Sequence, residues 1–198
     1  DAGMLFYAPQ IWTSDDTDPI ARLKIQSGTS YGYPVSSMGA HVSATPNHQT
    51  GRTTPFSTRG VVAMSGTFGY ELDLGKFSAE EKEMVKAQIR EFHKYYWLIQ
   101  KGFYYRLDQA STENYFTAWE FVSEDGKEAL LNLVVTDVRA NPEFPYVRVK
   151  GLNPEAVYMV EGTDKTYTGA ALMYGGYVFD QLFGDYPAVQ IHLVEIEM

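Results

Sequence analysis

The sequence predicts an α/β segment followed by an all-β domain, divided into residues 1–106 and 107–198. Three observations support this prediction. An apolar run at the start of the chain is followed by a polar loop and a helix start, and a long amphipathic helix ends near Gly102. From about Leu107 the hydrophobic period changes from helical to alternating.

The first β/α unit begins with Met4–Trp12, which is almost continuously apolar. Strands that are apolar on both faces are typical of buried parallel sheets, so we expect a strand here. Asp18 can cap a helix, Pro19 suits its first position, and Gly28 is its expected end.

Two further strands and a long helix complete this part. Met38–Ala44 and Gly60–Leu74 are expected to be strands, which makes three strands of a parallel sheet. Eight strands are needed to close a barrel, so three cannot form one alone. Ser78 and Glu81 form a capping box at the start of the helix. The helix carries one apolar stripe with spacings of four and three: Val85, Ile89, Phe92, Tyr96 and Ile99.

The second part reads as short strands separated by Gly, Pro, Asn and Asp. Such spacing predicts an antiparallel β-sandwich. The expected strands are 115–122, 129–138, 146–150, 156–161, 165–168 and 189–197.

Composition excludes several classes of partner. The formal net charge is −9, which would repel a phosphate backbone, so we expect no nucleic acid partner. The sequence has neither an apolar run of 18 residues nor a basic amphipathic helix, so we expect no association with a membrane. The sequence has no cysteine, which fits a reducing compartment and suggests a cytoplasmic protein. Because the chain starts inside an apolar run, we interpret it as part of a longer protein.

Asp15 and Asp16 are the candidates for chemistry because they follow Trp12 at the end of the first expected strand. A carboxyl group beside an aromatic wall can have its pKa raised enough to donate a proton, as glycoside hydrolysis requires. In a second interpretation these aspartates, with Asp18, only cap the helix that follows. The histidines lack metal-ligand spacing, so no metal is expected.

A dense polar loop, Asn47–Arg52, lies at the same expected edge of the sheet. It could contact a sugar or a neighbouring subunit, or it could simply be solvated.

Several segments together resemble the bacterial α-galactosidases of glycoside hydrolase family thirty-six. The resemblance is dense over the first 75 residues and continues into the C-terminal region. The segments that carry it are Gly3–Asp18, Arg22–Gln26, Met38–Ser43, Pro46–Thr50, Phe68–Asp73, Gly151–Pro154 and Tyr167–Gly169.

This resemblance implies a fold and a set of roles. The first part would be strands six to eight of a (β/α)8 barrel, followed by the family's closing β-domain. The family releases terminal α-linked galactose from raffinose- and melibiose-type oligosaccharides with retention and without a cofactor. By position, Asp15 resembles the general acid/base. Trp12 would lie at the substrate, with Asp16 beside it either as a substrate contact or as a supporting or helix-capping residue. Asp1 would end a glycine-rich segment that lines the galactose pocket.

The family's nucleophile lies in a Lys-x-Asp segment, which this sequence does not contain. We therefore expect the chain alone to be inactive. Three alternatives stay open: a relative that transfers galactose to another sugar, a non-catalytic oligomerisation fragment, and a free-standing sugar-binding sandwich. An exposed sheet edge would also favour a homo-oligomer.

Overall fold

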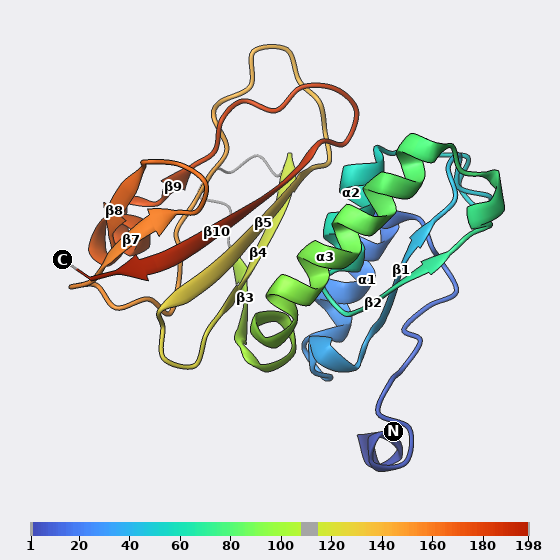
Figure 1. Cartoon of the computed structure of the whole chain (residues 1–198), viewed down its shortest axis with the longest axis horizontal. Coiled ribbons are helices and arrows are strands. Elements are labelled where there is room, and N and C mark those ends of the chain that lie inside the picture. The colour runs from blue at the N-terminus through green and yellow to red at the C-terminus, as the bar shows by residue number, and fades with distance from the viewer. Residues whose placement is uncertain (1, 108–114, 198) are drawn as a thin grey trace. The chain divides into compact units, whose positions relative to one another are not determined.

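A computed structural model describes residues 2–107 and 115–197 of the chain (Figure 1). The chain forms two compact units, residues 1–100 and 101–198. The division after residue 106 stays a prediction. Among the described residues, no helix combines the length and apolar character needed to cross a bilayer.

The first unit contains two parallel strands, the helix between them in sequence, and further helices before and after them. Strands β1 (Gly39–Ser43) and β2 (Thr67–Glu71) pair in register from Gly39–Thr67 to Ser43–Glu71. Its helices are η1 (Ala2–Phe6), α1 (Pro19–Thr29), η2 (Val35–Ser37), α2 (Phe56–Ala63), η3 (Leu74–Lys76) and α3 (Ala79–Lys101).

The expected strand at Met4–Trp12 is not formed. Ala2–Phe6 is a 3-10 helix, and Ile11 contributes one isolated parallel bridge, to Met38. Phe6 and Tyr7 are 85% and 80% exposed. A parallel strand that is apolar on both faces needs neighbours along its edges and cover on both faces. In the described residues, that bridge is the only backbone strand pairing of this segment.

The expected strand at Gly60–Leu74 is also wrong over its first half, because α2 extends from Phe56 to Ala63. All of its residues except Ser57 are buried. A short helix that is buried all round gives the same apolar run as a buried strand, so periodicity cannot distinguish the two.

The prediction of α3 is confirmed, and so is its capping box. The Glu81 amide donates to Ser78 Oγ at 3.2 Å, and the Ser78 amide donates to Glu81 Oε2 at 2.9 Å. Of the predicted apolar stripe, Val85 and Ile99 are buried, while Ile89 remains 37% exposed. Val85 packs with Val42, Phe56 and Ala63 in the core of this unit.

The second unit is an antiparallel sheet with the strand order β3-β4-β5-β10-β7-β8, beside a two-stranded sheet of β6 and β9 (Figure 1). The strands are β3 (Phe103–Leu107), β4 (Phe116–Val122), β5 (Glu128–Val135), β6 (Tyr146–Val147), β7 (Val157–Val160), β8 (Thr166–Thr168), β9 (Tyr177–Val178) and β10 (Ala188–Ile196). The sequence did not indicate β3 or β9. Residues of both sheets share one apolar core, including Leu131, Val147 and Tyr177.

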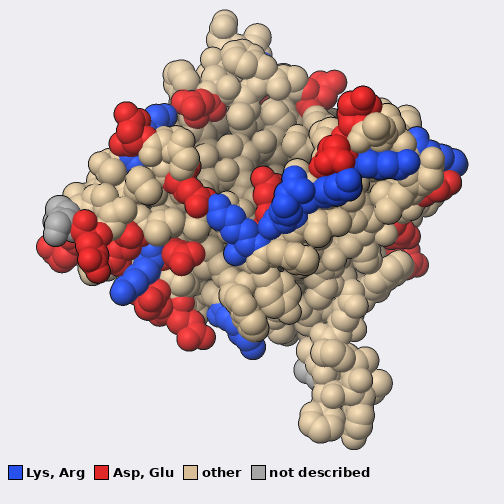
Figure 2. Space-filling model, viewed as in Figure 1, with Lys and Arg blue, Asp and Glu red and all other residues tan. Residues whose placement is uncertain are grey.

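Charged side chains of both signs are interspersed on the visible face of the chain (Figure 2). On α3, exposed basic residues recur every fourth position, at Lys82, Lys86, Arg90 and Lys94. Lys86 pairs with Glu83 at 2.6 Å. These side chains form a basic row along α3 within an acidic chain.

Candidate active site

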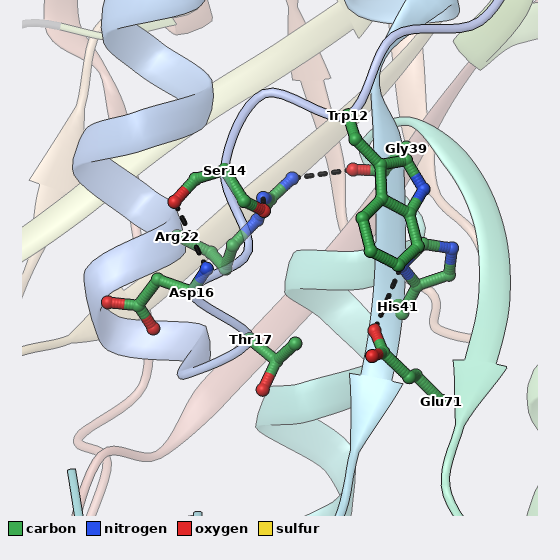
Figure 3. A pocket seen from close by; sticks show the side chains of 8 residues that line it. All are labelled: Trp12, Ser14, Asp16, Thr17, Arg22, Gly39, His41 and Glu71. Atoms are coloured by element: carbon green, nitrogen blue, oxygen red, sulfur yellow. Dashed lines mark hydrogen bonds and ion pairs between the residues drawn. The ribbon is translucent and has the colours of Figure 1, made fainter. Parts of the chain in front are cut away.

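A pocket opens beside the two parallel strands of the first unit (Figure 3). Its walls come from the segment before α1, from α1 itself and from both strands. It is lined by Trp12, Ser14, Asp16, Thr17, Arg22, Gly39, His41 and Glu71. The pocket therefore brings together the region around Trp12 and Asp16, which the sequence singled out, and strand residues that it did not.

Trp12 forms the aromatic wall. Its ring lies 5.2 Å from the ring of His41, centroid to centroid, and Figure 3 shows it over β1. The indole is held close to the strand because position 39 is glycine. A Cβ atom on Gly39 would lie 2.7 Å from Trp12 Cδ1, which is inside van der Waals contact. Trp12 is 57% exposed in this chain, so the indole offers an apolar surface to a ligand.

Arg22 crosses from α1 to the strands. Its Nη2 atom donates to the Gly39 carbonyl at 2.5 Å, and its Nη1 atom donates to the Ser14 carbonyl at 3.2 Å. Burial lowers the pKa of Arg22, while the negative charges of Asp16 and Glu71 oppose that shift. The guanidinium thus ties the loop after Trp12 to the start of β1.

His41 and Glu71 lie on neighbouring strands and face each other, with 3.6 Å between Nδ1 and Oε2 (Figure 3). Burial lowers the pKa of His41 below its ordinary value, and the Glu71 carboxylate opposes that change. The imidazole is therefore mainly neutral at pH 7 and can accept or donate a hydrogen bond.

Two of the three neighbouring aspartates have structural partners. Asp18 caps α1, because its Oδ1 atom accepts from the Ile20 amide at 2.9 Å, and Oδ2 pairs with Arg52. This confirms the capping role of Asp18. Asp16 Oδ1 accepts from the Asp18 amide at 2.9 Å, and in Figure 3 its carboxylate points away from Trp12. Its geometry is that of a turn residue at the rim of the pocket.

Asp15 has an exposed side chain in this chain. It lies in the loop that reaches the carboxyl end of β1, where Ser43 Oγ donates to the Thr17 carbonyl at 2.9 Å. The pocket takes its lining carboxylates from Asp16 and Glu71, and Asp15 lies at the preceding position of the loop. Asp1 falls outside the described residues.

The polar loop Asn47–Arg52 folds onto this segment. Asn47 is 3% exposed, and its Nδ2 atom donates to Thr17 Oγ1 at 3.0 Å. Gln49 Nε2 donates to the Asp15 carbonyl at 3.0 Å. The loop therefore uses part of its polarity to hold the segment that carries Asp15.

The sequence did not indicate that Arg22, His41 and Glu71 belong to this site. It also did not indicate that the Gln49 side chain bonds Asp15 and Thr17. The segments that contain Arg22, His41 and Glu71 belong to the resemblance, but no spacing rule connects them. Within the described ranges, no group of three or more His, Asp or Glu residues is arranged to hold a metal ion.

Acidic side chains and an exposed indole beside the ends of parallel strands are features of glycoside hydrolases. The family comparisons agree with this class. The melibiase family model matches residues 1–102, and the model of the glycosyl hydrolase family 36 C-terminal domain matches residues 116–193. The chain belongs to the melibiase family, and the resemblance to family thirty-six α-galactosidases is confirmed.

Curated relatives match along the whole chain. It is 51% identical over 197 residues to the bifunctional alpha-galactosidase/sucrose kinase AgaSK of Mediterraneibacter gnavus. This match covers 100% of this chain and 21% of that protein. It is 46% identical to alpha-galactosidase AgaA of Geobacillus stearothermophilus, covering 100% of this chain and 27% of that protein. The chain therefore spans about a quarter of the length of these relatives.

Solved structures of α-galactosidases also superimpose on this chain over nearly its whole length. The galactosidase domain of AgaSK superimposes with a TM-score of 0.94 at 50% identity, covering 99% of this chain and 27% of that one. A variant of AgaA from Geobacillus stearothermophilus, solved in complex with raffinose, gives a TM-score of 0.93 at 45% identity with the same coverage. The mixed α/β segment followed by an antiparallel sheet is thus an arrangement found within larger α-galactosidases.

Proposed function

We propose that this chain is the C-terminal part of a retaining α-galactosidase and that Asp15 is its general acid/base. The observation that carries the proposal is the placement of Asp15. It is an exposed carboxylate in the loop at the carboxyl end of parallel strands, in a chain of this family. Catalytic groups of barrel enzymes lie at this end of their strands.

In the proposed reaction Asp15 protonates the departing oxygen while a carboxylate nucleophile attacks the anomeric carbon. The deprotonated Asp15 then takes a proton from the water that releases galactose. Such a retaining mechanism requires two carboxyl groups about 5–5.5 Å apart. The nucleophile would come from a part of the protein outside residues 1–198, so the chain alone is expected to be inactive.

The neighbouring residues have supporting roles in this proposal. Trp12 would provide an apolar face for the sugar, and Asp16 would shape the rim of the pocket, because its carboxylate is already used by the Asp18 amide. Asp1 would lie near the galactose. The substrates would be raffinose- and melibiose-type oligosaccharides, as the raffinose complex of a relative suggests.

The proposal includes the larger architecture. The Ile11 segment, β1 and β2 would be the sixth, seventh and eighth strands of a (β/α)8 barrel. The exposed start of the chain, including Phe6 and Tyr7, would then contact other barrel segments or a second subunit of a homo-oligomer.

The test uses the full-length protein with Asp15→Ala and an aryl α-galactoside, with and without azide. An activated leaving group needs little acid assistance, so the variant should stall at deglycosylation, where azide can replace the activated water. We expect azide to restore turnover and to yield α-galactosyl azide. Asp164→Ala removes an exposed aspartate between β7 and β8 and should leave activity unchanged.

Two results would contradict the proposal. If Asp15→Ala is as active as the unaltered protein, Asp15 is not the acid/base. If residues 1–198 alone release galactose, a nucleophile lies within this chain and the division of the site is wrong. Free galactose measured against oligosaccharide product in the full-length protein separates hydrolysis from transfer to another sugar.

A further inference from the structure

We propose that Gln49 is a positioning residue that holds Asp15 in place for proton transfer, an inference that rests on the acid/base role proposed for Asp15. Gln49 belongs to the loop after β1 and is separated from Asp15 by 34 positions in the sequence. Its side chain bonds the Asp15 carbonyl, so its action on the reaction would pass through Asp15.

The Gln49 side-chain amide bonds two backbone groups of the segment that carries Asp15, the Asp15 carbonyl and the Thr17 N–H. Its Nε2 atom donates to the Asp15 carbonyl at 3.0 Å, and its Oε1 atom accepts from the Thr17 amide at 3.0 Å. This pairing fixes the orientation of the amide. The opposite orientation would place a donor against the Thr17 N–H and an acceptor against the Asp15 carbonyl.

Thr17 is a firm anchor for this bridge. It is 8% exposed, and its carbonyl accepts from Ser43 Oγ at 2.9 Å, at the end of β1. Its hydroxyl accepts from Asn47 Nδ2 at 3.0 Å. Gln49 therefore ties Asp15 to a residue that is already fixed to the strand.

Gln49 is itself held by its own loop. Asn47 Oδ1 accepts from the backbone N–H of Gln49 at 2.9 Å and from the backbone N–H of Thr50 at 3.1 Å. The buried Asn47 side chain thus fixes the backbone at Gln49, from which the bridging side chain extends. Groups organised before substrate binds need no rearrangement at the moment of reaction.

Asp15 depends on this contact. Over residues 2–107 and 115–197, the Gln49 bond is the one hydrogen bond recorded for Asp15. A general acid must stand within hydrogen-bond reach of the oxygen that it protonates. Misplacement by about 1 Å can cost on the order of 100-fold in rate.

The experiment compares kcat/KM of the full-length protein on two substrates. From a dinitrophenyl α-galactoside the departing dinitrophenolate is stable as an anion and needs no proton, whereas raffinose releases sucrose, whose departing alkyl oxygen must be protonated. Gln49→Ala removes both bonds of the bridge. Gln49→Glu keeps the acceptor for Thr17 but sets a carboxylate oxygen against the Asp15 carbonyl. Gln190→Ala is the matched control, because it removes a glutamine bond to Asn132 in the second unit.

We expect both Gln49 variants to lose about 10- to 100-fold in kcat/KM on raffinose and less than about 2-fold on the dinitrophenyl substrate. Gln190→Ala should change neither. A purely structural role would reduce the active fraction and lower both values equally, which would overturn the inference. So would unchanged values on raffinose. Activity on the dinitrophenyl substrate also shows that each variant has folded.

Asp15→Ala, measured in the same series, separates this inference from the proposed function. If Asp15→Ala loses raffinose activity selectively and the Gln49 variants do not, only the positioning role is refuted. If Asp15→Ala keeps its raffinose activity, there is no acid/base at this position to be held, and both proposals are refuted together.

Discussion

Replacing Glu120 by glutamine should change how the stability of the chain depends on pH. Glu120 lies on β4 with 0% of its surface exposed. Its Oε1 atom accepts from the Lys150 amide at 2.7 Å, whereas Oε2 is buried and has no hydrogen-bond partner among the described residues. Burial raises the pKa of Glu120 to about 8, against the opposing effect of the bond and charge of Lys150.

The sign and size of the effect follow from linkage. The folded state holds a proton on Glu120 that the unfolded chain releases above its ordinary pKa of about 4.5. This contribution to stability is complete below about pH 4.5 and is lost as pH rises through about 8. At about 1.4 kcal/mol per pH unit, the whole loss is on the order of 5 kcal/mol as an upper bound.

Glutamine resembles the protonated glutamate in shape and charge, so Glu120→Gln should remove this pH dependence. Urea unfolding at pH 5, 7 and 9, followed by the fluorescence of the buried Trp119, measures the difference. We expect the two proteins to agree within about 1 kcal/mol at pH 5 and the variant to be more stable at pH 9 by several kcal/mol. Glu124→Gln, at an exposed position after β4, should follow the unaltered chain. Parallel curves for Glu120→Gln and the unaltered chain would refute the reasoning.

Three further changes test the fold by thermal unfolding. Ser78→Ala removes the capping bond to the Glu81 amide and should cost about 1 kcal/mol; Ser78→Thr keeps an acceptor, so an equal loss there would contradict the capping role. Gly28→Ala should stabilise α1 by about 0.5–1 kcal/mol, because a Cβ atom meets nothing within 4 Å, and a lower melting temperature would argue against that geometry. Gly169→Ala should destabilise by about 3 kcal/mol, because its Cβ atom would lie 1.9 Å from the Asn153 carbonyl oxygen; tolerance would show that this turn can open.

Local signals were sufficient for the elements whose ends are set by neighbouring residues. The Ser78–Glu81 box marked the start of α3, and Asp18 with Pro19 marked the start of α1, because capping is decided within one turn of helix. Burial was harder to predict. Apolar residues at 60–63 fit a buried strand and a buried helix equally well, and only tertiary packing selects between them.

The candidate site shows the same limit. Trp12 and the aspartates could be singled out because they follow one another closely at the end of the first expected strand. The bond from Gln49 to Asp15 spans 34 positions and joins a side chain to a backbone carbonyl, so no pattern of residue types reveals it. The pairing of His41 with Glu71 likewise depends on the register of β1 against β2.

The close approach of Trp12 to Gly39 has a consequence for the shape of the pocket in which we propose that the sugar binds. The indole occupies space that any other residue at position 39 would need, since even one methyl group would come within 2.7 Å of it. A substitution at position 39 would therefore displace the indole by direct contact and so change the aromatic wall of the pocket. Gly39 therefore helps to set the position of the indole and with it the width of the pocket beside Trp12.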